Sequence, residues 1–117
     1  MASLRPTERI RRRADFQRIY EHGTRVHGRL ATLFLLSNGL ETARLGIAAT
    51  KKLGGAVRRN RAKRLIRDVF RRCKVAAGFD LVVVPKRELL EATLTAIEAD
   101  YHRTLDRSLR ERQRRDA

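Results

Sequence analysis

The sequence predicts an α/β (α+β) sandwich, in which helices cover a small mixed sheet. Apolar residues recur at spacings of three and four in three segments, and short runs rich in β-branched residues lie between them. The elements follow the order α-β-β-α-β-α, with one further short strand allowed, and contain neither a repeat nor a linker. We expect one domain, with a solvated basic arm at residues 1–12, a folded part at about 13–106 and a charged tail at 107–117.

The first helix is predicted at residues 14–22. Phe16, Ile19 and Tyr20 are three or four positions apart, which places them on one face, and Gly23 follows as a typical end of a helix. So short a helix is marginal in isolation. We therefore expect it to depend on the packing of its apolar face.

Two strands are predicted next, at residues 30–36 and 43–50. Both segments have extended, apolar character, and the Ser-Asn-Gly sequence at 37–39 is typical of a tight turn. Antiparallel strands can be joined by such a short connection. We therefore expect these two strands to pair as an antiparallel hairpin.

The strongest helical pattern covers residues 57–74, after a loop that contains two glycines. Between Arg58 and Lys74 stand nine basic residues and a single acidic one, Asp68. Apart from Asn60, the remaining positions form one apolar stripe, which consists of Ala62, Leu65, Ile66, Val69, Phe70 and Cys73. The segment therefore predicts a helix with one face in the core and a basic face outside.

The final elements are a strand at residues 80–84 and a helix from about residue 88. The strand is short, rich in valine and ended by Pro85, as expected of a strand that is buried on both faces. The helix has an inward stripe of Leu90, Leu94, Ile97, Tyr101 and Leu105. From Arg107 onwards the charges alternate, and we expect the helix to give way to a solvated tail.

The charge of the chain indicates a polyanionic partner. Its 117 residues include 28 Lys and Arg against 13 Asp and Glu, and the formal net charge of +15 opposes any compact state. Nucleic acid is the partner that such charge most often serves. No apolar run approaches the roughly 18 residues of a membrane-spanning helix, so we expect a cytoplasmic protein without a membrane partner. The lone Cys73 argues against a disulfide or zinc scaffold.

The basic residues of the 57–74 helix gather on one side. At about 100° per residue, Asn60, Arg64, Arg67 and Arg71 fall opposite the apolar stripe. A guanidinium group can bind two phosphate oxygens at once. Because an ordinary solvated face mixes both signs of charge, this face predicts binding to the backbone of a folded RNA.

The signature of the bacterial ribonuclease P protein family closely resembles residues 51–67, KKLGGAVRRNRAKRLIR, with its Arg-Asn-Arg core at 59–61. The first helix of that family resembles the sequence DFQRIY at 15–20. Its last core strand resembles DLVVVP at 80–85. The resemblance covers roughly residues 10–105 in the same order and is far more specific than a short motif.

This resemblance implies a fold similar to the second domain of a small-subunit ribosomal protein, with a left-handed β-α-β crossover that general preferences would not suggest. It implies a noncatalytic subunit of an RNA-based endoribonuclease, which removes the 5′ leader of precursor tRNA. The partners would be ribonuclease P RNA and precursor tRNA, with no obligate protein partner. The ribonucleoprotein would require Mg²⁺, held mainly by RNA, while the protein alone would bind no metal and supply no catalytic residue.

The resemblance also implies two sets of RNA contacts. The predicted contacts to the RNA subunit are Arg58, Arg59, Asn60, Arg61, Lys63, Arg64, Arg67 and Arg71. The predicted contacts to the 5′ leader, in a cleft between the first helix and the sheet, are Phe16, Arg18, Tyr20, Phe34, Lys51 and Lys52. Aromatic rings in the second set would stack on unpaired bases without reading their sequence.

The residues alone leave other interpretations open. Phe16, Tyr20 and Phe34 also suit an ordinary core. A ribosomal or ribosome-assembly protein would share the charge, and so would a nonspecific DNA-binding protein. A protein-only nuclease is disfavoured, because the sequence shows no cluster of carboxylates or histidines that could hold a catalytic metal.

Overall fold

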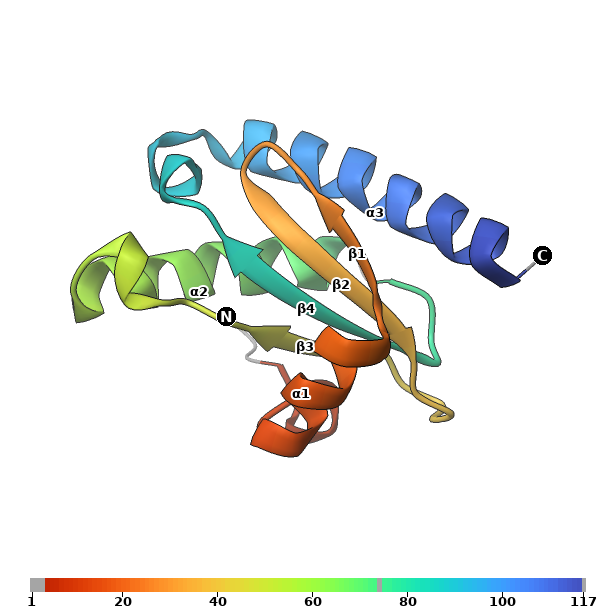
Figure 1. Ribbon diagram of the computed structural model, residues 1–117. Helices are drawn as coiled ribbons and strands as arrows, with labels where there is room; N and C mark the ends of the chain where they lie inside the picture. Colours follow the sequence, from red (N-terminus) through yellow and green to blue (C-terminus); the bar gives the residue numbers. More distant parts are fainter. Residues whose placement is uncertain (1–3, 74, 117) are drawn as a thin grey trace.

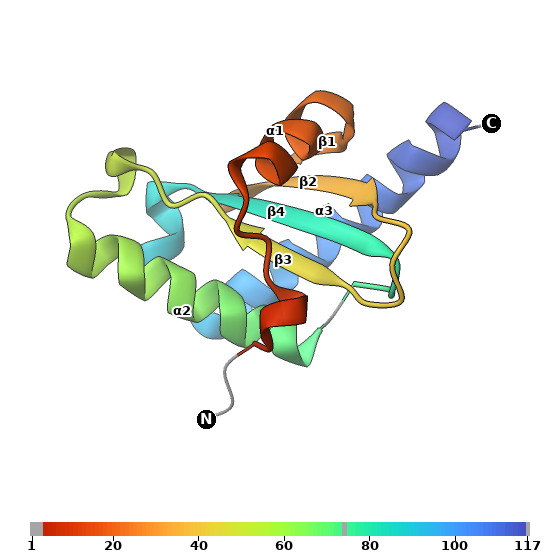
Figure 2. The ribbon, with the colours of Figure 1, turned by 90° about the horizontal axis from the view of Figure 1, so that it is seen from below.

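A computed structural model describes residues 4–73 and 75–116 of the chain. A four-stranded mixed sheet has helix α1 on one face and helices α2 and α3 on the other (Figures 1 and 2). The helices are α1 (Arg13–His22), α2 (Ala56–Arg72) and α3 (Leu94–Asp116). The strands are β1 (Thr24–His27), β2 (Ala31–Ser37), β3 (Arg44–Ile47) and β4 (Phe79–Pro85). Short 3-10 helices are η1 (Pro6–Glu8), η2 (Lys51–Leu53) and η3 (Arg87–Glu91). The predicted α/β sandwich is confirmed, and β1 is its further short strand.

The strands lie in the order β1-β2-β4-β3, so the predicted hairpin of β2 with β3 is wrong. β4 lies between them, antiparallel to β2 and parallel to β3, with Leu45 of β3 opposite Leu81. The Ser-Asn-Gly turn instead reaches over the start of β4. The Asn38 N–H donates to the Gly78 carbonyl at 2.8 Å, and the Gly78 N–H donates to the Thr42 carbonyl at 3.2 Å. The turn residues determine only that the chain reverses direction after β2. Which strand then pairs with β2 depends on contacts between residues far apart in the sequence.

β3, α2 and β4 form a β-α-β unit whose two strands are parallel neighbours. The chain leaves β3, passes through α2 on the face opposite α1 and returns to β4, as Figures 1 and 2 show. This crossover is left-handed, as the family resemblance implied and against the usual preference. It places α2 and α1 on opposite faces of the sheet.

β4 is buried on both faces, as predicted. Leu81 and Val83 belong to a large core with α2 and α3, whereas Val82 belongs to a smaller cluster with Ile10 and Ile19 on the α1 side. Leu81 and Val82 are 0% exposed, and Val83 is 2% exposed. Complete burial of one such side chain contributes about 1.5–3 kcal/mol, so β4 stabilises both layers at once.

The apolar stripe of α2 packs against the large core. Its fully buried members are Ala62, Ile66, Val69 and Phe70. Leu65 and Cys73 are only half-buried against the same core. The helix already ends at Arg72, with Cys73 as its C-cap, while the predicted end at Lys74 lies outside the described residues.

The N-terminal arm is packed, and the prediction of a solvated arm is wrong. Leu4 and Ile10 are each 5% exposed. The Ile10 N–H donates to the Leu45 carbonyl at 2.9 Å, which attaches the arm to β3 at the edge of the sheet. Two apolar residues in an arginine-rich segment form no periodic pattern, so the sequence did not indicate this packing.

α3 begins and ends later than predicted. η3 precedes it, and the Thr93 hydroxyl accepts the Ala96 N–H at 3.1 Å as an N-cap contact. Its last turns are held by Ser108, which is fully buried, and by Arg112, whose guanidinium lies 4.9 Å from the centroid of the Phe79 ring. The alternating charges therefore form the outer face of a packed helix. Neither α3 nor any other described helix is long and apolar enough to cross a membrane.

The carboxylate of Asp80 joins α1, β3, β4 and the turn after β2. Arg44 donates to its two oxygens at 2.8 and 2.6 Å, Asn38 donates at 2.8 Å, and Arg18 of α1 donates at 3.3 Å. Asp80 is 0% exposed. Burial alone would raise the pKa of Asp80, but the hydrogen bonds from Arg44 and Asn38 and the charges of Arg44 and Arg18 outweigh it and lower the pKa.

Replacing Asp80 with Asn should lower the free energy of unfolding at neutral pH by about 3–5 kcal/mol, because two arginines lose a buried counter-charge. Since the pKa of Asp80 is lower in the folded state, its contribution is complete above the unfolded value of about 3.9 and is lost as pH falls through the folded pKa. Urea denaturation at neutral pH and at a series of acidic pH values measures both effects. The stability of the parent protein should fall more steeply with acid than that of the variant, and equal slopes would exclude Asp80 as the responsible group.

Candidate nucleic-acid interface

α2 presents the predicted RNA-subunit contacts in two groups. The exposed group is Arg58, Asn60, Arg61 and Arg64. The half-buried group, which follows one side of the helix at four-residue spacing, is Arg59, Lys63, Arg67 and Arg71. The single acid of the helix, Asp68, forms an ion pair with Arg71. Most of the positive charge of α2 is therefore not balanced within the helix.

The start of α2 is shaped by Arg58 and Gly54. The Arg58 Nε donates to the Leu53 carbonyl at 2.7 Å, which folds this side chain back over η2. A Cβ at Gly54 would lie 2.6 Å from the Arg58 Cδ, and Gly54 has a φ of 120° that side-chain-bearing residues rarely adopt. The absence of a side chain at Gly54 therefore leaves space for the Arg58 side chain, whose hydrogen bond to Leu53 stabilises the turn before α2.

Phe16 and Tyr20 of α1 meet Phe34 of β2 in an aromatic cluster. The ring centroids of Phe16 and Tyr20 are 6.3 Å apart, and those of Tyr20 and Phe34 are 4.9 Å apart in an edge-on arrangement. Phe16 and Phe34 are half-buried against the small core, whereas Tyr20 is 39% exposed. Burial raises the pKa of the Tyr20 hydroxyl. The cluster combines core packing with a ring that is open to solvent.

Gly46 of β3 makes room for Phe16. A Cβ at Gly46 would lie 2.8 Å from the Phe16 Cζ, so the ring lies directly over the glycine backbone. The sequence interpretation missed Gly46. A glycine inside a strand often marks the close approach of another group, and that was the available indication.

The charged residues predicted for the leader lie in two places. Arg18 is tied to the fold, because its guanidinium is 3.3 Å from Asp80 and 3.6 Å from Asp15, although its side chain remains 40% exposed. Lys51 and Lys52 are exposed in η2, directly before α2. No described contact joins either lysine to the aromatic cluster. The structure thus brings Phe16, Tyr20 and Phe34 together, holds Arg18 at Asp80 and Asp15, and places the lysine pair directly before α2.

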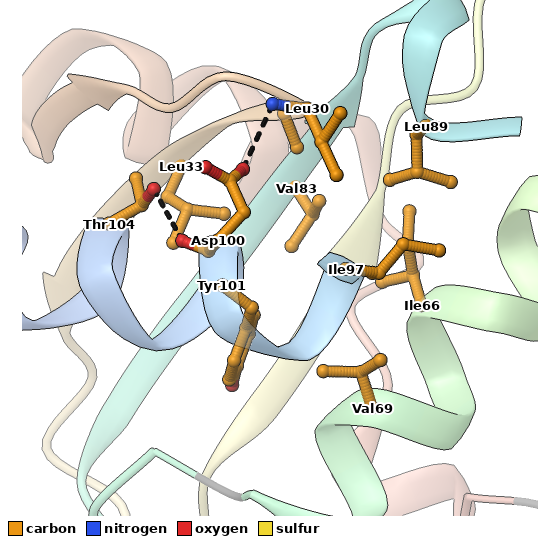
Figure 3. A pocket seen from close by; sticks show the side chains of 11 residues that line it. Leu30, Leu33, Ile66, Val69, Val83, Leu89, Ile97, Asp100, Tyr101 and Thr104 are labelled. Carbon is orange, nitrogen blue, oxygen red and sulfur yellow. Dashed lines mark hydrogen bonds between the residues drawn. The ribbon is translucent and has the colours of Figure 1, made fainter. Parts of the chain in front are cut away.

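A small apolar pocket between the sheet, α2 and α3 is part of the core (Figure 3). Its volume is about 20 Å³, enough for about one water molecule. On its wall, the Asp100 carboxylate accepts the N–H groups of Arg29 and Leu30 at 3.1 and 2.9 Å, and the Thr104 hydroxyl donates to the Asp100 carbonyl at 2.7 Å. These contacts hold α3 to the loop before β2. The volume of the pocket is too small for a substrate.

The described residues include no group of three or more His, Cys, Asp or Glu side chains that could hold a metal ion. The fold does bring His102 to Cys73, with the Nε2 atom 3.1 Å from the sulfur. This pair joins α3 to the end of α2, a contact that spacing along the sequence could not indicate. The arrangement that distinguishes this surface is therefore its cations and aromatic rings.

The chain is similar to known proteins over most of its length. A model of the family described as Ribonuclease P matches residues 4–109. The ribonuclease P protein component of Thermotoga maritima is 42% identical over 86 residues, 72% of this chain and 74% of the relative. That of Clostridium novyi is 33% identical over 109 residues, 90% of this chain and 96% of the relative.

Solved structures show the same fold. The RNase P protein from Thermotoga maritima matches with a TM-score of 0.77 at 35% identity, covering 86% of this chain and 96% of that chain. The RNase P protein of Staphylococcus aureus matches with a TM-score of 0.76 at 35% identity, covering 85% and 93%. The chain therefore belongs to the ribonuclease P protein family and is a protein subunit of that endoribonuclease.

Proposed function

We propose that the protein binds the RNA subunit through the basic face of α2 and assists that RNA in removing the 5′ leader from precursor tRNA. The observation that carries the proposal is the unbalanced charge of α2, in which the one acid already pairs with Arg71. Arginines on one helical face suit the phosphates of a folded RNA, and each phosphate that they neutralise releases counterions. The contacts assigned to this role are Arg58, Arg59, Asn60, Arg61, Lys63, Arg64, Arg67 and Arg71.

The aromatic cluster is the proposed contact for the leader. The Tyr20 ring is exposed and supported edge-on by Phe34, so an unpaired base can stack on it. Stacking on an aromatic side chain is worth about 1–3 kcal/mol per base. Lys51, Lys52 and the exposed part of Arg18 would contact leader phosphates. On the opposite face from α2, this cluster gives the substrate a surface separate from the one that binds the RNA subunit.

The proposed role of the protein is noncatalytic. Mg²⁺ ions required by the ribonucleoprotein would be held mainly by RNA, because phosphates supply the hard oxygen ligands that Mg²⁺ prefers. The protein's share is binding energy, through cations that reduce repulsion between two RNA molecules and rings that fix the leader. No further protein subunit is required by this scheme.

Cleavage of a 5′-extended precursor tRNA by a bacterial ribonuclease P RNA at low Mg²⁺ should be slow without this protein and accurate and fast with it. The protein alone should not cleave, since the proposal places the chemistry on the RNA. Measuring the rate and the cleavage position with RNA alone, protein alone and both together tests this. Cleavage by the protein alone, or no gain from its addition, would leave a nuclease or a general RNA binder instead.

Replacing Phe16 or Tyr20 with Ala should weaken binding of leader-bearing precursor to the reconstituted enzyme by about 1–3 kcal/mol, because a stacking surface is lost. Binding of mature tRNA should change little. The matched control is Phe79→Ala, which removes a half-buried ring under Arg112 outside the cluster. Thermal unfolding of each variant separates loss of stacking from loss of fold. Equal weakening of precursor and mature tRNA would favour the core interpretation.

Replacing Arg64 with Glu should weaken binding to the RNA subunit at least tenfold, because attraction to phosphate becomes repulsion. The effect should shrink as salt concentration rises. Arg110→Glu on α3 is the control, since Arg110 is also exposed and the change in net charge is identical. Filter binding over a range of salt concentrations gives the comparison. The same loss in both variants would mean that net charge alone governs binding and that α2 has no special role.

A further inference from the structure

A groove of about 310 Å³ lies between the N-terminal arm, β3, α1 and α2. In Figure 2 the arm crosses the edge of the sheet from α2 to α1, and its residues line one side of the groove. The floor is apolar and is formed by Leu4, Ile10, Phe16, Leu45 and Ile47. The walls carry cations, Arg9 and Arg11 from the arm and Lys63 and Arg67 from α2. Among the described residues that line it there is no acid.

The four cations lack counter-charges. None of them forms an ion pair with another residue in the described part of the chain. Burial lowers the pKa of Arg67, and the charge of Arg9 lowers it further, which shows that the two walls repel each other. Four positive groups therefore face a common space at an energetic cost that the fold itself does not offset.

One wall of the groove also has an unsatisfied hydrogen-bond donor. The Nε of Arg9 on the arm is buried and has no hydrogen-bond partner among the described residues. A second such donor, the Nε of Arg59, does not line the groove but lies one turn before Lys63 on α2. Buried donors are normally paired. Unpaired donors beside unbalanced cations indicate an acceptor that carries negative charge.

We propose that this groove binds a phosphodiester group of single-stranded RNA, with the phosphate oxygens held by side chains of both walls. A volume of about 310 Å³ is at the lower end of the range of about 300–1,000 Å³ for small-molecule pockets, which suits a single strand and excludes a duplex. The apolar floor suits a sugar or base edge. The N-terminal arm is thus a binding element, because it supplies one wall.

The groove is continuous with the aromatic cluster, because Phe16 lines both. A strand whose bases stack on Phe16 and Tyr20 can pass its backbone between the arm and α2. Two RNA strands could supply the phosphate, the 5′ leader or an unpaired strand of the RNA subunit. Only this choice of strand rests on the proposed function.

Binding of a single-stranded 12-nucleotide RNA to the isolated protein tests the groove directly. The double variant Arg9→Gln/Arg11→Gln should bind roughly tenfold more weakly or worse, and the slope of log K against log salt should fall by about 0.7 for each lost phosphate contact. The control Arg25→Gln/Arg110→Gln removes two exposed cations outside the groove and should keep the parent slope. Equal changes in both double variants would overturn the proposal.

Lys63→Gln/Arg67→Gln removes the opposite wall and should reproduce the loss, which keeps the test decisive if the arm variant is poorly folded. Isoleucine-methyl NMR adds a readout of position. Ile10 and Ile47 line the groove, whereas Ile66 and Ile97 are buried in the large core and do not line it. RNA should change the methyl chemical shifts of Ile10 and Ile47 and leave those of Ile66 and Ile97 unchanged. Inorganic phosphate at equal ionic strength should cause smaller changes in the same two signals. Absent or uniform shifts would reject the site.

Binding measurements with the reconstituted enzyme then show which RNA, the 5′ leader or the RNA subunit, supplies the phosphate. A loss confined to leader-bearing precursor in the Arg9→Gln/Arg11→Gln variant assigns the groove to the leader, and a loss of affinity for the RNA subunit assigns it to that RNA. Neither loss, together with an unchanged salt slope, rejects the groove. If the parent protein fails to assist the RNA subunit, the proposed function fails, and the measurements on the isolated protein still decide whether the groove binds phosphate.

Discussion

The burial of β4 on both faces is the constraint on which the rest of the structure depends. A strand that presents Leu81 and Val83 to one side and Val82 to the other requires a helical layer on each face, because either row would otherwise meet water. α1 covers one face, and α2 and α3 cover the other. Asp80, at the start of the same strand, adds polar contacts to this apolar packing. Its carboxylate accepts hydrogen bonds from Arg18 of α1 and Arg44 of β3. One strand thus fixes the positions of both layers.

This arrangement has a functional consequence. The crossover places α2 and the aromatic cluster of α1 and β2 on opposite faces of the sheet, so the two surfaces proposed to bind RNA point in different directions and meet at the groove that Phe16, Lys63 and Arg67 line. The N-terminal arm connects them around the edge of β3. It is anchored there by the hydrogen bond from Ile10 to Leu45 and by the burial of Leu4. A single small sheet can therefore support contacts to two RNA molecules.

The positive side chains of the protein repel one another, and this repulsion is relieved when RNA binds. Its formal net charge is +15, and only a few arginines are used to stabilise the fold, such as Arg44 at Asp80 and Arg112 over Phe79. Arg9 and Arg67 are partly buried on facing walls of the groove and form no ion pair among the described residues. Such an arrangement is costly in the free protein and favourable once phosphates occupy the surface. Stability and RNA affinity should therefore be coupled most strongly at α2 and the arm.

The sequence by itself determined the elements and the chemistry of their faces. The stripe from Ala62 to Phe70 required a helix with arginines outside, the valines after Asp80 required a strand buried on both sides, and residues 51–67 identified the family, because periodicity and motifs are local properties of a chain. Only the tertiary structure decided that β4 separates β2 from β3, that the arm packs on the sheet, that α3 extends to Asp116 and that Gly46 receives Phe16. Each of these depends on contacts between residues far apart in sequence. Periodicity shows that a face is apolar, but the identity of its partner follows from how all faces are buried together.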